Sequence, residues 1–241
     1  TAVDLERYAL NVKIDVVGRR AFCGYQLTGR KGLDRRHRWI YHPRVTLRTP
    51  IAYAMLVLSG FARSPGALHD PFCGSGTILL EAAGVLAERG GSDGETVRLS
   101  GSDLRLEAVD GARANLQAAG LDRIPVAHHD ARELGTLIPR ASLDFIVTNP
   151  PFGIRLGRGS NFHALYREFL SGAADALRPG GVLALLVGKR RGVFNRILQG
   201  FPELEVQSVR IVEMGGVYAA LFLLRRTAIA EPVVDRSDQR L

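Results

Sequence analysis

The chain of 241 residues is 46% apolar and 23% charged, which is typical of globular proteins and excludes disordered and fibrous classes. Its formal net charge of +8 favours a polyanionic partner such as a nucleic acid. No apolar run reaches the ~18 residues of a membrane span, and no secretory signal is visible. Because the sequence begins at Thr1 rather than at Met, we expect a fragment of a longer protein.

The first elements are two alternating segments, residues 10–17 and 21–27, which predict a short N-terminal β-hairpin. A basic stretch, 29–48, follows without clear periodicity and indicates a linker, so we assign residues 1–48 to the hairpin and this linker. Two cysteines, Cys23 and Cys73, form neither a disulfide framework nor a four-cysteine metal site. A reducing, cytoplasmic location is therefore the simplest interpretation.

Basic residues gather in the linker, beside two aromatic rings. Arginine next to aromatic side chains suits phosphate contact combined with base stacking. The alternative is a solvated linker in a chain whose arginine bias comes from a GC-rich genome, because lysine occurs only at positions 13, 31 and 189. The residues concerned are Arg30, Lys31, Arg35, Arg36, His37, Arg38, Arg44 and Arg48, with Trp39 and Tyr41 beside them.

Beyond the linker, Pro50 opens a predicted helix over residues 51–62, with Thr49 as its N-cap. Apolar strands then alternate with helices. The predicted strands are 67–70, 97–103, 124–130, 143–148 and 182–188, and the predicted helices are 78–89, 106–120, 162–177 and 193–201. Arg178-Pro179-Gly180-Gly181 closes the helix at 162–177, and a last hairpin joins 205–214 to 217–226 around Gly215-Gly216.

This alternation predicts an α/β domain with a mostly parallel sheet over residues 49–230, followed by a frayed polar tail at 231–241. Ligands of such sheets bind at the carboxyl ends of the strands, near the point where the strand order reverses. Each apolar strand delivers one polar side chain to that edge. One such residue is a turn signal, whereas several in register indicate a site; they are Asp70, Asp103, Asp130 and Asn149.

The segment DPFCGSGT (70–77) follows a predicted strand and opens a helix. Gly74 and Gly76 permit a tight backbone and close approach of a ligand, and the helix N-terminus favours a negative group such as a carboxylate. Position 79 is Leu, so the dinucleotide-binding pattern fails, and no Gly-Lys-Ser/Thr follows as in a phosphate-binding loop. The alternative is an ordinary strand-to-helix turn.

Two further acids follow strands. Asp103 is placed to accept hydrogen bonds from both hydroxyls of a ribose, as in dinucleotide folds. The alternative is that Asp103 serves as a helix N-cap. Asp130 is placed to accept from an adenine amine, again with a capping role as the alternative. His128 and His129 point opposite ways on a strand and have no metal-ligand spacing around them, so we interpret them as structural and expect no metal.

The segment NPPFG (149–153) ends an apolar strand in a rigid loop, because two prolines fix φ and remove two backbone donors. The Asn149 side-chain oxygen and the Pro150 carbonyl are placed to accept from an exocyclic amine and aim its lone pair at a methyl group. Phe152 would stack on the target base, which must be exposed or flipped. No Ser-His-Asp or paired-carboxylate arrangement competes, and the alternative is a Pro-rich turn.

Together, DPFCGSGT and NPPFG resemble the motifs of S-adenosylmethionine-dependent methyltransferases with an N-P-P-F/Y motif. The resemblance is closest to the group that methylates N2 of guanine in RNA and usually carries an N-terminal THUMP domain, and it covers about residues 45–226. It implies a Rossmann-like class I methyltransferase fold with a seven-stranded sheet and a C-terminal antiparallel hairpin. It also implies S-adenosylmethionine as cofactor, RNA as partner with tRNA ahead of rRNA, and a monomeric enzyme without metal.

The resemblance also implies roles for individual residues. Gly74 and Gly76 would line the methionine part of the cofactor, Asp103 the ribose, and Asp130 with Ala131 the adenine. The catalytic residues would be Asn149, Pro150, Pro151 and Phe152. The cofactor-binding residues would be Asp70, Pro71, Cys73, Gly74, Ser75, Gly76, Thr77, Asp103, Leu104, Asp130, Ala131 and Asn149. The hairpin and linker resemble the end of a THUMP-type domain, whose complete form is absent, which fits a fragment.

Other functions compete with this interpretation. An adenine-N6 methyltransferase of DNA or RNA shares the N-P-P-F motif, because its target is also an exocyclic amine, and a protein-amide methyltransferase is more distant. If the chain were a non-catalytic RNA-binding module, we would expect a broken loop or the loss of Asn149. The loop and Asn149 are both intact. Candidate phosphate contacts, with a solvated face as the alternative, are Arg155, Arg158, Lys189, Arg190 and Arg191.

Overall fold

The computed structural model describes residues 11–26, 36–44, 46–89, 98–151, 162–214, 216 and 218–227 of the chain. The predicted linker residues 29–35, Gly215 and the tail from residue 228 lie outside the described residues. The chain divides into two compact units, Thr1–His37 and Arg38–Leu241.

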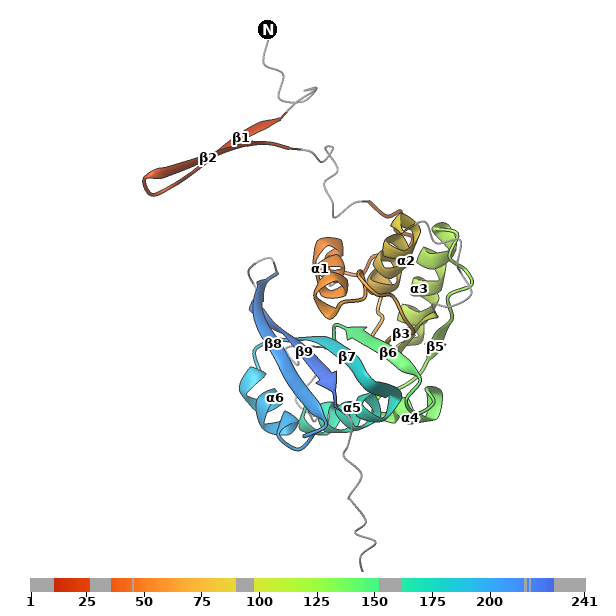
Figure 1. Cartoon of the computed structure of the whole chain (residues 1–241). Coiled ribbons are helices and arrows are strands. Elements are labelled where there is room, and N and C mark those ends of the chain that lie inside the picture. Colours follow the sequence, from red (N-terminus) through yellow and green to blue (C-terminus); the bar gives the residue numbers. More distant parts are fainter. Residues whose placement is uncertain are drawn as a thin grey trace, which may run out of the picture. The chain divides into compact units, whose positions relative to one another are not determined.

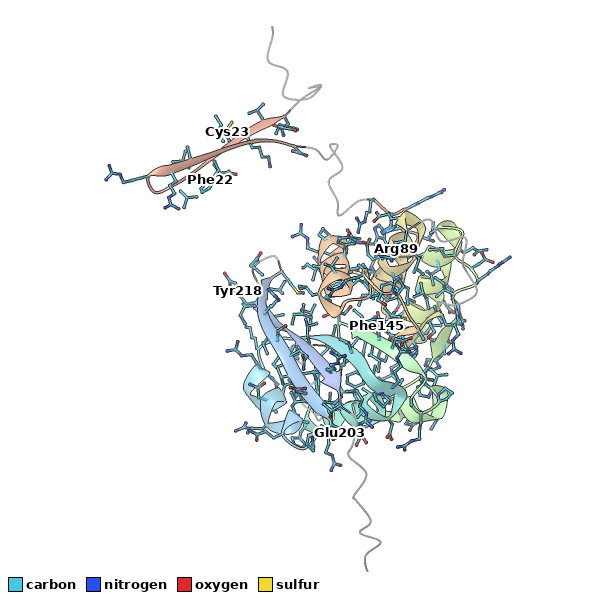
Figure 2. The ribbon with its side chains drawn as sticks, viewed as in Figure 1. Phe22, Cys23, Arg89, Phe145, Glu203 and Tyr218 are labelled. Carbon is cyan, nitrogen blue, oxygen red and sulfur yellow. The ribbon has the colours of Figure 1, made fainter. Side chains whose placement is uncertain are left out.

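The first unit contains an antiparallel hairpin of β1 (Val12–Val17) and β2 (Arg20–Tyr25), which confirms the predicted N-terminal hairpin. Every residue of both strands is exposed. Phe22 pairs with Asp15 and Cys23 with Ile14, so these neighbours belong to opposite faces of the ribbon (Figure 2).

The second unit is built on a seven-stranded sheet in the order β5-β4-β3-β6-β7-β9-β8. Neighbours from β5 to β7 are parallel, and β9 is antiparallel to both β7 and β8. The predicted Rossmann-like sheet with a C-terminal antiparallel hairpin is confirmed. Its strands are β3 (Leu68–Asp70), β4 (Leu99–Asp103), β5 (Val126–His128), β6 (Leu143–Thr148), β7 (Leu177–Val187), β8 (Leu204–Glu213) and β9 (Tyr218–Arg226).

Helices cover both faces of this sheet (Figure 1). On one face lie α1 (Thr49–Ser59), α2 (Thr77–Glu88) and α3 (Leu106–Ala118), and on the other α4 (Leu134–Leu137), α5 (Phe162–Ala176) and α6 (Arg191–Leu198). Each face buries its own apolar core. Phe145 of β6 meets Phe61 edge-on at 5.5 Å in the first core (Figure 2), whereas the next residue, Ile146, faces the second. The apolar run 145–147 in the middle of β6 therefore suits a strand that is covered on both sides.

Helix α1 begins earlier than predicted, and the assignment of Thr49 as its N-cap is wrong. Arg48 is the N-cap, and its carbonyl accepts from Ile51 N and Ala52 N. Thr49 and Pro50 occupy the first helical positions, where the fixed φ of proline is compatible with the helix and its missing N–H is no loss. The helix ends at Gly60, whose φ of 92° is left-handed.

The prediction that Arg178-Pro179-Gly180-Gly181 closes a helix as a loop is also wrong, because these residues lie within β7. Leu177 pairs with Leu143, and pairing with β6 resumes only at Val182, so 178–181 form an irregularity inside the strand. The pairing of β9 with β7 also begins at Val182, so among the described residues this stretch has no paired strand on that side. Proline and glycine are tolerated at such bulges and edges.

Within the described part of the chain, none of the helices has the length and apolarity needed to cross a membrane.

Candidate active site

The predicted site residues gather at the carboxyl edge of the sheet. β3 ends at Asp70, β4 ends at Asp103, and Asn149 directly follows β6. The chain runs outward from β3 to β4 and β5, then returns to β6 on the other side of β3. Asp70 and Asn149 therefore flank the point where the strand order reverses, the usual ligand position in open α/β sheets.

The loop between β3 and α2 has a backbone that glycine alone adopts easily. Gly74 has a φ of +53° and Gly76 a φ of +81°, and both values are left-handed. A Cβ at Gly74 would meet nothing within 4 Å, so space in front of the loop is open, whereas a Cβ at Gly76 would lie 3.4 Å from that of Ala112. The loop thus turns closely against α3 and presents the N-terminus of α2 to a ligand.

Hydrogen bonds tie this loop to the strands on both sides. Gly74 N donates to Asp103 Oδ2 at 2.9 Å, which links the loop to β4. Thr148 Oγ1 donates to Asp70 Oδ1 at 2.6 Å, which links it to β6, and both of these residues are buried. The loop is therefore held in place before any ligand arrives.

Asp70 is a buried carboxyl group near the centre of the site. Its Oδ1 also accepts from Phe72 N at 3.1 Å. Burial raises its pKa to about 7, the hydrogen bonds from Thr148 and Phe72 oppose that rise, and the Asp103 charge adds to it. Burial likewise raises the pKa of the neighbouring Cys73 thiol, so Cys73 forms a neutral wall of the loop.

Asp103 keeps acceptor capacity for a ligand. Oδ2 accepts from Gly74 N and Oδ1 from Arg105 N, each at 2.9 Å. A carboxylate oxygen has two lone pairs, so one remains on each oxygen. Leu104, the next residue, is 60% exposed, an apolar surface beside that carboxylate. Asp103 thus has two acceptor positions that suit the hydroxyls of a ribose, and Leu104 has an apolar surface that suits a base.

Asp130 lies beyond the end of β5, which is shorter than the predicted strand at 124–130. It is the N-cap of a 3-10 turn, Ala131–Glu133, as the alternative interpretation had it. Its Oδ1 accepts from Arg132 N at 2.9 Å, and its Oδ2 accepts from Arg132 Nε at 2.9 Å and from the terminal nitrogen at 2.5 Å. The side-chain bond from Arg132 lowers the pKa of Asp130. For a role in adenine binding, Asp130 would use the second lone pair of its Oδ1.

Asn149 carries the unusual feature of the site. Its Oδ1 is buried and has no hydrogen-bond partner among the described residues. Pro150 is buried and Pro151 is exposed, so the chain leaves the core at once. A buried acceptor without a donor costs ~1–3 kcal/mol, which a ligand N–H would recover. Phe152, Arg155 and Arg158 lie outside the described residues.

Histidines near the site are held by internal contacts. His128 Nε2 lies 2.7 Å from Leu104 O, and His129 Nε2 lies 2.9 Å from Thr136 Oγ1. His69 is buried between two serine hydroxyls, and burial lowers its pKa to about 4. In the described ranges, no cluster of three or more His, Cys, Asp or Glu side chains is placed to hold a metal.

Of the candidate phosphate contacts, Lys189, Arg190 and Arg191 are exposed just after β7, at the same edge as Asn149. The Arg190 guanidinium lies 5.4 Å from the centre of the Phe162 ring, at the start of α5. A cation over an aromatic face is attracted to it. This contact holds a positive charge on the edge where the site opens.

Sequence reasoning missed two residues that shape the site. The sequence predicts Thr148 only as the last residue of an apolar strand, whereas its hydroxyl bonds to Asp70 at the neighbouring strand end. Asn115 lies in α3, and its amide bonds to Ser75 O at 2.9 Å and to the backbone of Ile40 and Tyr41. Nothing in the helical pattern of α3 pointed to these partners.

The chain matches the family model UPF0020, described as an RMKL-like methyltransferase domain, over residues 35–220. It is 40% identical to the tRNA (guanine(6)-N2)-methyltransferase of Thermus thermophilus, covering 93% of this chain and 62% of that protein. It is 35% identical to the tRNA (guanine(10)-N2)-dimethyltransferase of Methanothermobacter thermautotrophicus, covering 67% of this chain and 44% of that protein.

Among solved structures, the crystal structure of TrmN from Thermus thermophilus superposes with a TM-score of 0.71 at 36% identity. The match covers 92% of this chain and 61% of that chain. The chain thus spans about three fifths, or less, of the length of these relatives.

Proposed function

Because the chain belongs to the UPF0020 family of RMKL-like methyltransferase domains, we propose that it transfers a methyl group from S-adenosylmethionine to the exocyclic N2 amine of a guanine in RNA, with tRNA ahead of rRNA. The relatives named above act, by their names, on guanine N2 at different tRNA positions. Their agreement on the atom and difference in position support the amine as the target and leave the position open.

The proposed cofactor site is the loop 70–77 with the two strand ends beside it. The space in front of Gly74 and the N-terminus of α2 suit the methionine part, whose carboxylate a helix N-terminus favours. The remaining lone pairs of Asp103 suit the ribose, and Leu104 with the buried Ala131 suits the adenine. When bound, S-adenosylmethionine supplies an electrophilic methyl group on a sulfonium.

The single observation that carries the proposal is the buried Oδ1 of Asn149 after β6, which has no partner among the residues that the structure describes. It would accept one N–H of the guanine amine, and the Pro150 carbonyl would accept the other. Held in this way, the nitrogen points its lone pair at the methyl carbon, and orientation supplies much of the barrier reduction. No strong base is needed, because the nitrogen becomes acidic as it forms its new bond and releases its proton to water.

The remaining features are proposals of the same kind. Phe152 would stack on the flipped base, and the basic side chains after β7 would contact phosphates. We expect a monomer that works without a metal ion in the cytoplasm. The adenine-N6 alternative uses the same acceptors, so the guanine assignment rests on the relatives.

The test is nucleoside mass spectrometry in two settings. Purified chain with S-adenosylmethionine and tRNA transcripts should form N2-methylguanosine, and a deletion strain should lose it from tRNA and regain it with the wild-type gene. A transcript with inosine at the target lacks the N2 amine and should stay unmethylated. Loss of N6-methyladenine from the deletion strain, with N2-methylguanosine unchanged, would overturn the proposal.

A further inference from the structure

Asn115 uses the full hydrogen-bonding capacity of its amide inside the protein. It is 0% exposed. Oδ1 accepts from Ile40 N at 2.8 Å and from Tyr41 N at 2.9 Å, and Nδ2 donates to Tyr41 O at 2.8 Å and to Ser75 O at 2.9 Å. A side-chain amide offers two donors and two lone pairs. One side chain therefore joins α3, the segment before α1 and the loop that follows β3.

The segment at Trp39–Tyr41 is docked on α3 by its side chains as well. Gly111 lies one helical turn before Asn115, and a Cβ there would come within 2.2 Å of the Tyr41 ring. Trp39 packs against the apolar core of the same face. The ring of Tyr41 thus fills the place that a side chain at position 111 would take, and the absence of one makes the docking possible.

The exposed side of this docked segment carries two arginines. Arg38 and Arg44 are both exposed. Ile40 and His42 between them are exposed too, and the ring of His42 meets that of Trp39 edge-on at 5.3 Å. The two guanidinium groups stand on a backbone that is fixed to the domain, and such groups suit the phosphates of an RNA strand.

Ser75, whose carbonyl accepts from the Asn115 amide, lies between the two left-handed glycines of the loop. Its carbonyl can be held by Asn115 only while the Asn115 amide keeps its present orientation, which the backbone of Ile40 and Tyr41 fixes from the other side. Undocking the segment would free that amide to rotate and would take away the donor that holds Ser75 O, while Gly76 N would keep its bond to Cys73 O.

We propose that Asn115 is a positioning residue that couples RNA on the docked basic segment to the methyl donor on the loop 74–76. The inference rests on the proposed function, since it takes the loop as the cofactor site and RNA as the partner. Coupling between two sites is reciprocal, so RNA would strengthen cofactor binding by the same factor that the cofactor strengthens RNA binding. A factor of about ten is expected from typical couplings.

The test uses Gly111→Ala. The new methyl group displaces the Tyr41 ring, whereas alanine is favourable for the helix itself. Gly84→Ala is the matched control, because that position in α2 is also helical and a Cβ there meets nothing within 4 Å. Hydrogen exchange without ligands should rise in Gly111→Ala both at residues 39–41 and at 70–77, and stay unchanged in Gly84→Ala. A rise in exchange that is confined to residues 39–41 would contradict the coupling through Asn115.

Calorimetry with S-adenosylhomocysteine then measures the coupling itself. Gly111→Ala and Asn115→Ala should each weaken binding about tenfold, and the double variant should be no weaker than Asn115→Ala alone. A tRNA transcript that the wild-type chain methylates should tighten cofactor binding about tenfold in the wild type and have no effect in Gly111→Ala. Additive losses, or an RNA effect that is the same in both proteins, would overturn the proposal.

Two controls separate the possible failures. Tyr41→Ala removes the ring without touching α3 and should reproduce both the exchange and the calorimetric result if Gly111→Ala does not fold. A wild-type chain that does not bind the cofactor at all would refute the proposed function, while the exchange experiment would still decide whether the docked segment controls the loop.

Discussion

The two halves of the candidate site are built differently. The donor half, loop 70–77 with Asp103, is tied by hydrogen bonds to β4, to β6 and to α3. The acceptor half, Asn149 to Pro151, contains a buried oxygen that has no partner among the described residues. In the proposed function, the half that internal hydrogen bonds already hold loses little order when the cofactor binds, whereas the Asn149 oxygen would gain its hydrogen bond from the substrate amine. The difference predicts that changes in the two halves have separable effects.

The largest expected effect lies in the acceptor half. Asn149→Ala should lower the rate of methyl transfer at saturating cofactor by about 10²–10³-fold, ~3–4 kcal/mol, as for the loss of one positioned hydrogen-bonding group. Cofactor affinity should change by less than about threefold, because the donor half is intact. Single-turnover kinetics and calorimetry measure the two quantities. Asn195→Ala, at an exposed position of α6, is the control; equal loss of cofactor binding in Asn149→Ala would refute the division into halves.

The next effect concerns Asp70, which belongs to the donor half and bonds to Thr148, the residue before the acceptor half. A carboxyl whose pKa rises to about 7 on folding keeps its proton while the unfolded chain loses it, so the free energy of unfolding falls as pH rises from about 4 to about 7. Asp70→Asn removes this loss and keeps an acceptor for Thr148. Relative to wild type, the variant should gain about 3 kcal/mol between pH 5 and pH 8.

Urea unfolding at the two pH values measures this gain. Thr148→Val is a useful companion, because it removes the hydroxyl that favours the ionised carboxylate. That variant should lose more stability at pH 8 than at pH 5. An Asp70→Asn stability difference that is the same at both values would show that Asp70 does not titrate in this range.

A smaller effect should follow from Gly76→Ala in the donor half. A left-handed φ costs ~1–2 kcal/mol for a residue with a Cβ, and the new methyl would lie 3.4 Å from the Ala112 Cβ, so the strain comes from the backbone. Cofactor affinity should fall about tenfold while the rate at saturating cofactor stays close to wild type. Gly84→Ala, in open space, should leave both unchanged. A loss confined to the rate would place Gly76 in the acceptor half instead.

The smallest effect is expected at Arg190, outside both halves. Arg190→Ala should weaken RNA binding and reduce the slope of log K against log salt by about 1, as for one lost phosphate contact. Cofactor affinity should stay the same. Filter binding over a salt series measures the slope, with Arg196→Ala farther along α6 as the control. An unchanged slope would leave Arg190 as a side chain that packs on Phe162 and does nothing for RNA.

Most of the sheet and the strand ends followed from sequence because the signals are local. An apolar run that stops at Asp70, Asp103 or Asn149 marks both a buried strand and the edge where it ends. The resemblance of two short motifs then added the family, which the match over residues 35–220 bears out. The roles of individual site residues stay predictions until ligands are bound.

The features that sequence reasoning missed depend on partners far apart in the chain. Asn115 meets Tyr41 across 74 residues and bonds its backbone, so no side-chain pattern announces the contact. Arg178-Pro179-Gly180-Gly181 has the composition of a turn, yet it lies in β7, at a point where the described part of β6 and β9 pairs only with the residues on either side of it. The capping role of Asp130 is one of the two interpretations that the sequence allowed. Its two side-chain bonds from Arg132 depend on a conformation that the sequence does not specify.

The bond between Thr148 and Asp70 also bears on how the sheet finds its alignment during folding. β6 is apolar toward both cores, so sliding it by one residue against β3 would still bury hydrophobic side chains on each face. Hydrophobicity alone therefore distinguishes the correct alignment poorly. A slipped strand, however, would leave the Asp70 carboxyl buried without its hydroxyl donor. The bond between Thr148 and Asp70 therefore favours the correct register of β6 against β3, in which Asn149 follows β6 at the edge beside Asp70.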